Sequence, residues 1–199
     1  MNKFKKLIAL AGVGLVLVLT ACSGQSSAAS IGDTQVPLST VQDTINEILK
    51  ERNKVETEDL TLAAGVELNT NAIRFHVISV IFDDIAEKIE MTVTDAELAA
   101  RREDIISQIG SEDGLAFALV GAQIAPQDFE RYIRTVLLAE KIGAALESQG
   151  ETAADGSGIQ NLIIAMGKEQ KVDINPRYGS WDYETGNITP PADNEAIQK

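Results

Sequence analysis

The stretch from Phe117 to Leu146 constrains the fold most, because it predicts a long helix with apolar residues on two sides. Pro126 suits the first turn of that helix, where its missing N–H would have no helical partner. Apolar residues then recur at helical spacing at Phe129, Tyr132, Ile133, Val136 and Leu137. A second set faces the opposite side: Leu138, Ile142 and Leu146. We therefore expect this helix to lie between other elements of a mainly α-helical domain.

Five further segments have helical patterns. They are residues 39–52, 69–90, 94–110, 111–120 and 159–169. Capping-box pairs mark two of the starts, Ser39 with Gln42 and Thr94 with Glu97. The apolar run at 73–82 also fits a strand, because it is rich in β-branched residues, but its length favours a helix. The sequence thus predicts about six helices, with a stop at Gly121 before the long one.

Short strands are expected near both ends of the domain. Residues 30–38 read as two strands around a Gly32–Asp33 turn. Val172 and Ile174 alternate with polar neighbours and are followed by a proline, which predicts a brief strand there. Residues 53–67 read as a loop, and residues 151–158 as a linker.

The first 21 residues have the pattern of an export signal: a basic start, an apolar run and small residues at the end. They end in Leu19-Thr20-Ala21, followed by Cys22, which resembles the lipobox of bacterial lipoproteins. This resemblance implies lipid attachment at Cys22 and a position on the extracytoplasmic face of a bacterial membrane. The alternative is ordinary cleavage that leaves a free thiol. Residues 22–29 read as a flexible tether.

The charge of the chain is strongly acidic, with a net value of −13. The first 21 residues hold three of the 17 basic residues and none of the 30 acidic ones, so the remainder carries −16. Such a surface argues against nucleic-acid binding. With a single cysteine, the chain forms no internal disulfide. We expect one domain over residues 30–182 and a disordered tail over 183–199.

The domain resembles the N-terminal domain of SurA-type periplasmic chaperones and related parvulin foldases. The resemblance rests on VTDAEL from Val93 and on spaced residues after it: Phe117, Leu119, Gly121, Ile124, Phe129, Ile133, Arg134, Leu137, Lys141 and Ile142. It also includes the opening segment from Ala29 and the returning segment VDINPRYGSWD from Val172. It implies a helical chaperone core in which the chain ends meet in a small sheet of two or three strands.

The chain departs from many members of that family at the linker. Those members carry a prolyl isomerase domain there, whereas residues 151–169 are far too few for a compact domain. We therefore expect no isomerase activity. No GxSxG, HExxH or CxxC motif is present either, so we expect neither an enzyme nor a cofactor.

The single histidine and the acid pairs have ordinary structural explanations. His76 lies at helical spacing from Ile73 and Val80, as a histidine at the edge of a core would, although a pH switch is the alternative. Asp83 and Asp84 are neighbours in a helix and do not face one another, so a paired-carboxylate site is poorly supported. Glu112 and Asp113 are read in the same way.

Aromatic residues are the candidates for client binding. They are Phe75, Phe82, Phe117, Phe129, Tyr132, Tyr178 and Trp181. Most aromatic side chains in such helices pack in a core, and Tyr178 and Trp181 also suit the anchoring of a terminal strand. Any that line an open apolar groove would form the client site. We expect chaperone-like binding of unfolded exported polypeptides, and the alternative is an adaptor lipoprotein that docks one folded partner.

Overall fold

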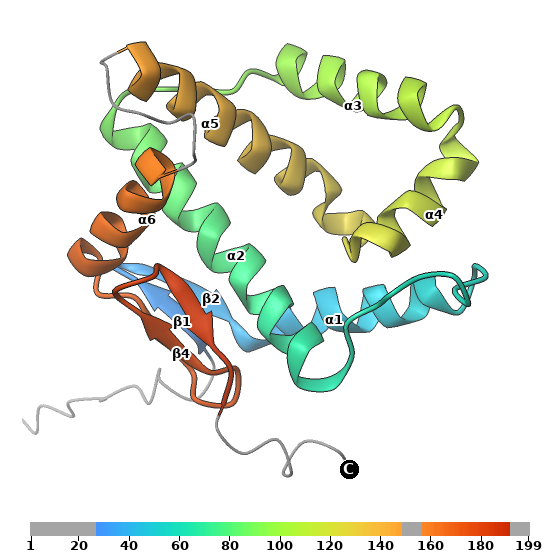
Figure 1. The fold of residues 1–199 in the computed structure, drawn as a ribbon, viewed down its shortest axis with the longest axis horizontal. Coiled ribbons are helices and arrows are strands. Elements are labelled where there is room, and N and C mark those ends of the chain that lie inside the picture. Colours follow the sequence, from blue (N-terminus) through green and yellow to red (C-terminus); the bar gives the residue numbers. More distant parts are fainter. Residues whose placement is uncertain (1–26, 149–156, 192–199) are drawn as a thin grey trace, which may run out of the picture.

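The computed structural model of the chain describes residues 27–148 and 157–191. Six α-helices and five β-strands lie in these two ranges, and the strands form two small antiparallel sheets (Figure 1). The prediction of a mainly α-helical fold with a small β element is confirmed. No helix in the described part is long and apolar enough to cross a membrane.

The centre of the fold is the pair of helices α2 (Gly65–Lys88) and α5 (Phe129–Ser148), which pack on each other. α2 is a helix and not a strand, and Ile73, Val77 and Ile81 on it are fully buried. It begins at Gly65, a turn before the predicted start, because the Leu68 N–H already bonds the carbonyl of Ala64.

α5 lies between α2 and α3 (Figure 1), so the predicted sandwich of the long helix is confirmed. Ile133 and Leu137 on one side and Leu138 and Ile142 on the other are all buried. A short 3-10 helix, η2 (Pro126–Asp128), precedes α5 and begins at the proline, as expected.

Helices α3 (Asp95–Ile109) and α4 (Glu112–Ala122) form a hairpin beside α5, which we call the arm. Thr94 and Glu97 make the predicted capping box, and Gly110 ends α3 in a left-handed conformation. The predicted stop at Gly121 is wrong by two residues. α4 continues to Ala122, and Gln123 takes up the left-handed cap.

Ion pairs at the surface hold the arm to α5. No residue of α3 is buried. Arg101 donates two hydrogen bonds to the carboxylate of Glu140, at 2.9 and 2.6 Å. Lys141 lies 2.6 Å from Glu97, and together with the Thr94 groups it lowers the pKa of Glu97 to about 2. Exposed pairs of this kind contribute little free energy, so α3 is less firmly attached than α4, which is anchored by the buried Leu115, Leu119 and Val120.

The two ends of the described chain meet in a three-stranded sheet of order β2–β1–β3. These strands are β1 (Ser27–Ile31), β2 (Thr34–Pro37) and β3 (Asp173–Ile174). Ala29 pairs with Val36 on one side and with Ile174 on the other, so the expected union of the chain ends is confirmed. The tether predicted for residues 22–29 was too long. β1 begins at Ser27, because Ala28 and Ala29 are small enough to be buried beneath the helices.

A hairpin of β4 (Ser180–Asp182) and β5 (Asn187–Thr189) closes the domain. The disordered tail predicted for residues 183–199 is therefore wrong over its first part. Trp181 pairs with Ile188, and both are buried because the hairpin folds Ile188 back onto the core. Asp182 fixes the turn by accepting hydrogen bonds from Glu184 and Thr185. Residues 192–199 lie outside the described part.

The remaining helices are α1 (Leu38–Arg52) and α6 (Ser157–Glu169). The capping box predicted at Ser39 and Gln42 is absent, because Pro37 occupies the cap position and offers no side-chain hydrogen bond. Gln42 instead donates a hydrogen bond to the Tyr178 hydroxyl at 2.8 Å, which ties α1 to the end of the domain. Residues 149–156, which include most of the predicted linker, lie outside the described part.

Candidate functional site

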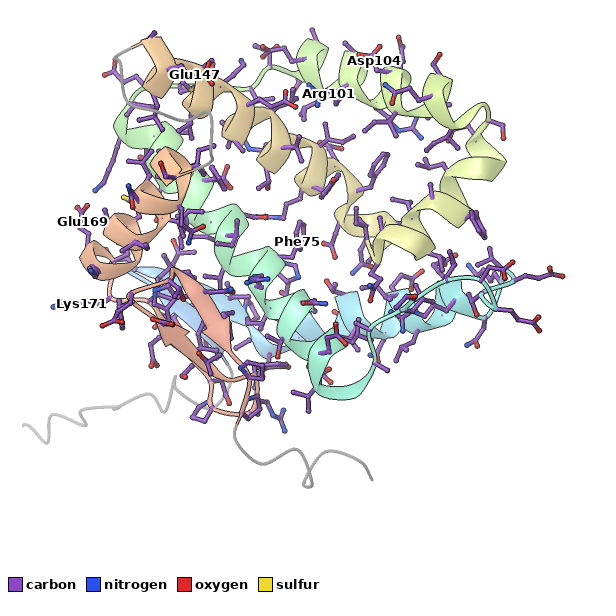
Figure 2. The ribbon with its side chains drawn as sticks, viewed as in Figure 1. Phe75, Arg101, Asp104, Glu147, Glu169 and Lys171 are labelled. Atoms are coloured by element: carbon purple, nitrogen blue, oxygen red, sulfur yellow. The ribbon has the colours of Figure 1, made fainter. Side chains whose placement is uncertain are left out.

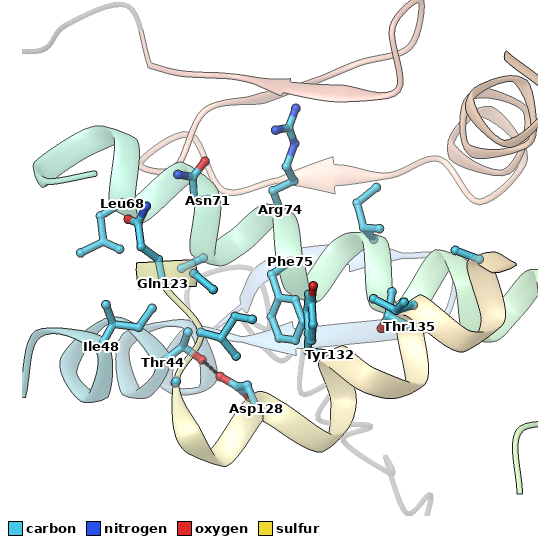
Figure 3. A pocket seen from close by; sticks show the side chains of 17 residues that line it. Thr44, Ile48, Leu68, Asn71, Arg74, Phe75, Gln123, Asp128, Tyr132 and Thr135 are labelled. Atoms are coloured by element: carbon cyan, nitrogen blue, oxygen red, sulfur yellow. Dashed lines mark hydrogen bonds between the residues drawn. The ribbon is translucent and has the colours of Figure 1, made fainter. Parts of the chain in front are cut away.

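A mainly apolar pocket of about 460 Å³ lies between α1, α2 and α5 (Figure 3), and we call it the central pocket. This volume is in the range of sites that bind small molecules or side chains. Its apolar lining comes from all three helices and from the end of α4: Ile48, Leu68, Ala72, Phe75, Ile78, Ala122, Ile124, Ala125, Tyr132, Val136 and Ala139. The polar residues of the lining are Thr44, Asn71, Arg74, Gln123, Asp128 and Thr135.

Two of the predicted aromatic residues line this pocket. Phe75 is half-buried and points from α2 into the space between α2 and α5 (Figure 2). Tyr132 reaches the pocket from α5 and is 36% exposed. The structure therefore brings these two candidates together in one pocket. Both rings present apolar surface to a ligand that enters from solvent.

A chain of polar side chains forms one wall of the central pocket. Thr44 on α1 donates a hydrogen bond to Asp128 Oδ2 at 2.6 Å (Figure 3), and His76 Nε2 lies 2.9 Å from the same Thr44 oxygen. A hydroxyl has one proton to donate, so His76 must donate its Nε2 proton to Thr44. This order fixes the tautomer of the imidazole, and Asp128 is the final acceptor in this row of hydrogen bonds.

His76 is 4% exposed, and its ring meets that of Phe75 edge-on at 5.0 Å. Burial lowers the pKa of His76, the carboxylate of Asp128 opposes this shift, and Arg131 adds to it. The histidine is therefore a buried residue with a hydrogen-bond partner, as expected. Its role is to hold Thr44 in place beside Asp128.

A second polar network closes one end of the pocket. Arg52 donates hydrogen bonds to the carbonyl of Ala63 at 2.8 Å and to the Gln123 amide oxygen at 2.9 Å. The Ala63 N–H donates to the same amide oxygen at 3.0 Å. Gln123, a pocket residue, thereby joins α1, the loop after it and the end of α4. Burial lowers the pKa of Arg52.

Four of the aromatic candidates are core residues, although Phe129 also borders the hollow between α3, α4 and α5. Phe82, Phe129, Tyr178 and Trp181 are each less than 9% exposed. They are buried because α2, α5 and the terminal hairpin turn them inward, and Trp181 packs directly on Gly167 of α6. Phe117 is 48% exposed on α4, but it does not line the central pocket.

Two further hollows lie on the arm side of α5. One, of about 580 Å³, is bordered by α3, α4 and α5, and the other, of about 420 Å³, lies between α3 and α5. The smaller hollow shares Tyr132 and Val136 with the central pocket and Ile133 with the larger hollow. α5 therefore has accessible apolar surface on both sides, with Tyr132 at the crossing point.

The neighbouring acids Asp83 and Asp84 have different surroundings. Asp83 accepts a hydrogen bond from Arg134 at 2.9 Å and lies 3.9 Å from Arg131, so it joins α2 to α5. The pKa of Asp84 is raised, first by burial and then by the nearby charges of Glu87 and Asp83. In the described ranges, no group of three or more histidine, cysteine, aspartate or glutamate residues is placed to hold a metal ion.

Sequence reasoning missed Thr44 and Asp128 as site residues. Asp128 has the pattern of an acid at a helix start, and Thr44 that of an ordinary polar position in α1. Cys22 lies outside the described residues.

No family model, curated protein or solved structure matches the chain. The resemblance to SurA-type chaperones therefore stays a proposal.

Proposed function

We propose that this protein is a lipid-anchored, extracytoplasmic chaperone-like protein that binds unfolded or extended segments of exported polypeptides. One observation carries the proposal: the central pocket is an open apolar site that two aromatic side chains, Phe75 and Tyr132, line. An unfolded chain offers apolar side chains that such a site removes from water. Burial of one such side chain contributes about 1.5–3 kcal/mol of free energy, which favours binding.

The arrangement around α5 suits an extended ligand more than a compact one. The central pocket and the two hollows adjoin through Tyr132, Ile133 and Val136, so successive side chains of one segment have separate places to enter. Ordering a flexible chain opposes binding, so each site should bind weakly. A weak site with mostly apolar walls also has little preference for one sequence, which is what a chaperone requires.

The arm supports the same function. It meets α5 through half-buried apolar residues and exposed ion pairs, and α3 has no buried residue. Small shifts of α3 therefore cost little free energy. A movable wall lets one site accept side chains of different size.

We propose a lipid anchor at Cys22 and no enzymatic activity. Lipid at Cys22 would hold the domain where exported chains emerge unfolded. No catalytic constellation and no isomerase domain is proposed. The competing function is an adaptor lipoprotein, which would bind one folded partner tightly and would not need an adaptable site.

The test is suppression of aggregation by the purified chain when a chemically unfolded exported protein is diluted, followed by light scattering. We expect suppression at near-stoichiometric ratios, and we expect Tyr132→Ala to weaken it. Phe117→Ala is the matched control, because it removes an exposed aromatic ring of similar size outside the central pocket. Suppression that Phe117→Ala abolishes and Tyr132→Ala leaves intact would place the site elsewhere. No suppression of several clients, with tight binding of one folded protein, would favour the adaptor.

A further inference from the structure

Asp128 is an acidic group in the wall of an otherwise mainly apolar pocket, and only one of its two carboxylate oxygens is occupied. Its side chain is 9% exposed. Oδ2 accepts the Thr44 hydrogen bond, whereas Oδ1 has no hydrogen-bond partner among the described residues. Fully buried side-chain atoms without a partner are confined, in these ranges, to Arg52 Nε and Trp181 Nε1. Oδ1 of Asp128 therefore keeps some accessible surface, and Asp128 lines the central pocket.

No cation of the described chain neutralises this carboxylate. Asp128 takes part in none of the ion pairs between described residues. Burial lowers the pKa of His76, which favours the neutral form of the imidazole. Arg131 lies 3.9 Å from Asp83, and Arg74, which also lines the pocket, points from α2 away from Phe75 (Figure 3). The site thus combines mainly apolar walls with a carboxylate that forms no ion pair with a described cation, and a ligand's cation would complement that charge.

We propose that the central pocket prefers client segments in which a lysine adjoins an apolar residue, with the lysine ammonium bonded to Asp128 Oδ1. This proposal rests on the proposed function and names its preferred ligand. The apolar residue and the lysine stem would pack against Phe75 and Tyr132, as lysine stems commonly do on apolar surfaces. A hydrogen bond between two charged groups in such a site is stronger than one at the surface.

The free oxygen also distinguishes lysine from arginine. A guanidinium is bound best by two carboxylate oxygens at once, and the Thr44 hydroxyl already takes one of the acceptor positions of Oδ2. An ammonium is a compact donor that needs one acceptor. We therefore expect lysine to be preferred to arginine here, although arginine is the usual choice for carboxylate pairing.

The first test compares fluorescent peptides on the wild-type chain by anisotropy. The peptides share one apolar sequence and differ at a single position, which is lysine, acetyl-lysine, arginine or glutamate. We expect the lysine peptide to bind most tightly, with about a tenfold loss for acetyl-lysine, as is typical for one charge-assisted hydrogen bond. Arginine should fall between them, and glutamate should bind most weakly.

The second test separates Asp128 from the net charge of the protein. Asp128→Asn keeps an acceptor for Thr44 and removes the charge. Glu103→Gln is the matched control, because it removes one charge from an exposed position on α3 outside all three hollows. Asp128→Asn should lower affinity for the lysine peptide about tenfold and leave the acetyl-lysine peptide unchanged, and Glu103→Gln should change neither.

The outcomes separate this proposal from the proposed function. Equal binding of the lysine and acetyl-lysine peptides by the wild-type chain would overturn the lysine preference and leave chaperone binding standing. An equal loss with Glu103→Gln would show that the overall charge attracts lysine, and would also overturn it. Failure of every peptide to bind would overturn both. The peptide series on the wild-type chain decides the matter even if Asp128→Asn proves unstable.

Discussion

The Thr44 hydroxyl donates a 2.6 Å hydrogen bond to the Asp128 carboxylate, 84 residues further along the chain. This bond joins α1 to η2, which directly precedes α5, and His76 on α2 donates to the same hydroxyl oxygen. Three helices therefore meet at one threonine side chain, which holds the acidic wall of the central pocket in position.

The first prediction concerns Thr44→Val, which keeps the shape of the side chain and removes the hydroxyl. Asp128 loses its donor and His76 loses its acceptor, and both are buried. We expect the free energy of unfolding to fall by about 1–3 kcal/mol in urea titrations. Thr61→Val, at an exposed position, is the control and should change stability by less than about 0.5 kcal/mol. Equal effects of the two variants would contradict a structural role for the Thr44 bonds.

The second prediction is a pH dependence of stability from His76. Burial holds its folded-state pKa below the ordinary value of 6.5, so the unfolded chain binds the proton more readily. The contribution is fully present above about pH 6.5 and is lost as the pH falls towards the folded-state value. Urea unfolding between about pH 8 and pH 5 should show stability falling with acidity.

His76→Asn supplies the control for that measurement. His76 is the only histidine of the chain, so the variant has no imidazole that titrates in this range. It should show a flatter stability profile than the wild-type chain, even if its stability is lower at every pH. The same slope in both proteins would assign the effect to other groups.

The third prediction concerns two glycines with opposite requirements. Gly179 has φ of 124°, and a Cβ there would collide with the carbonyl oxygen of Thr189. Gly179→Ala should therefore lower stability by about 1–3 kcal/mol through strain in the terminal hairpin. Gly121 lies in α4, where a Cβ would make ordinary contact with Leu60. Gly121→Ala should raise stability by about 0.5–1 kcal/mol, and thermal unfolding should show shifts of opposite sign.

The fourth prediction concerns the returning segment. Residues 172–189 contribute five buried side chains to the common core: Val172, Ile174, Tyr178, Trp181 and Ile188. A chain that ends at Lys171 should therefore unfold as a whole at much lower denaturant concentration, not merely lose one end. A chain that ends at Pro191 keeps every described residue and should unfold like the full chain. Unchanged unfolding of the shorter chain would show that the sheet is not part of the cooperative unit.

The fifth prediction concerns Cys22. One acyl chain anchors a protein only marginally, so stable attachment requires more than one, as on a multiply acylated cysteine. Mass spectrometry of the membrane fraction should show a mature N-terminus at Cys22 with two or three acyl chains. Cys22→Ser should release the protein from the membrane or leave the signal uncleaved. A soluble, unmodified mature protein would contradict the proposed anchor.

Local patterns predicted most of the helical fold. The Thr94 capping box and the Pro126 start were correct because both depend on groups within one helical turn. The two apolar sides of α5 predicted its place between other helices for a similar reason. Errors arose where burial depended on distant partners. Ala28 and Ile188 look too small or too isolated to be buried, yet each lies in a strand that the rest of the domain covers.

The candidate site was predictable only in part. The list of aromatic residues contained Phe75 and Tyr132, but nothing in the sequence separated them from Phe82 and Phe129, which have the same helical spacing. The direction in which each ring points depends on how α2 and α5 cross. The polar wall was not predictable at all, because Thr44 and Asp128 meet only through that packing.

The sequence by itself determined most of the helices, the Thr94 capping box and the acidic charge, because periodicity and capping act over a few residues. The meeting of the chain ends was implied by the family resemblance and not by a local pattern. The tertiary structure alone decided which aromatic rings remain accessible and which become core. It also decided that one carboxylate oxygen of Asp128 has no hydrogen-bond partner among the described residues, in a mainly apolar pocket. Both outcomes depend on the relative placement of α1, α2 and α5, which no local pattern encodes.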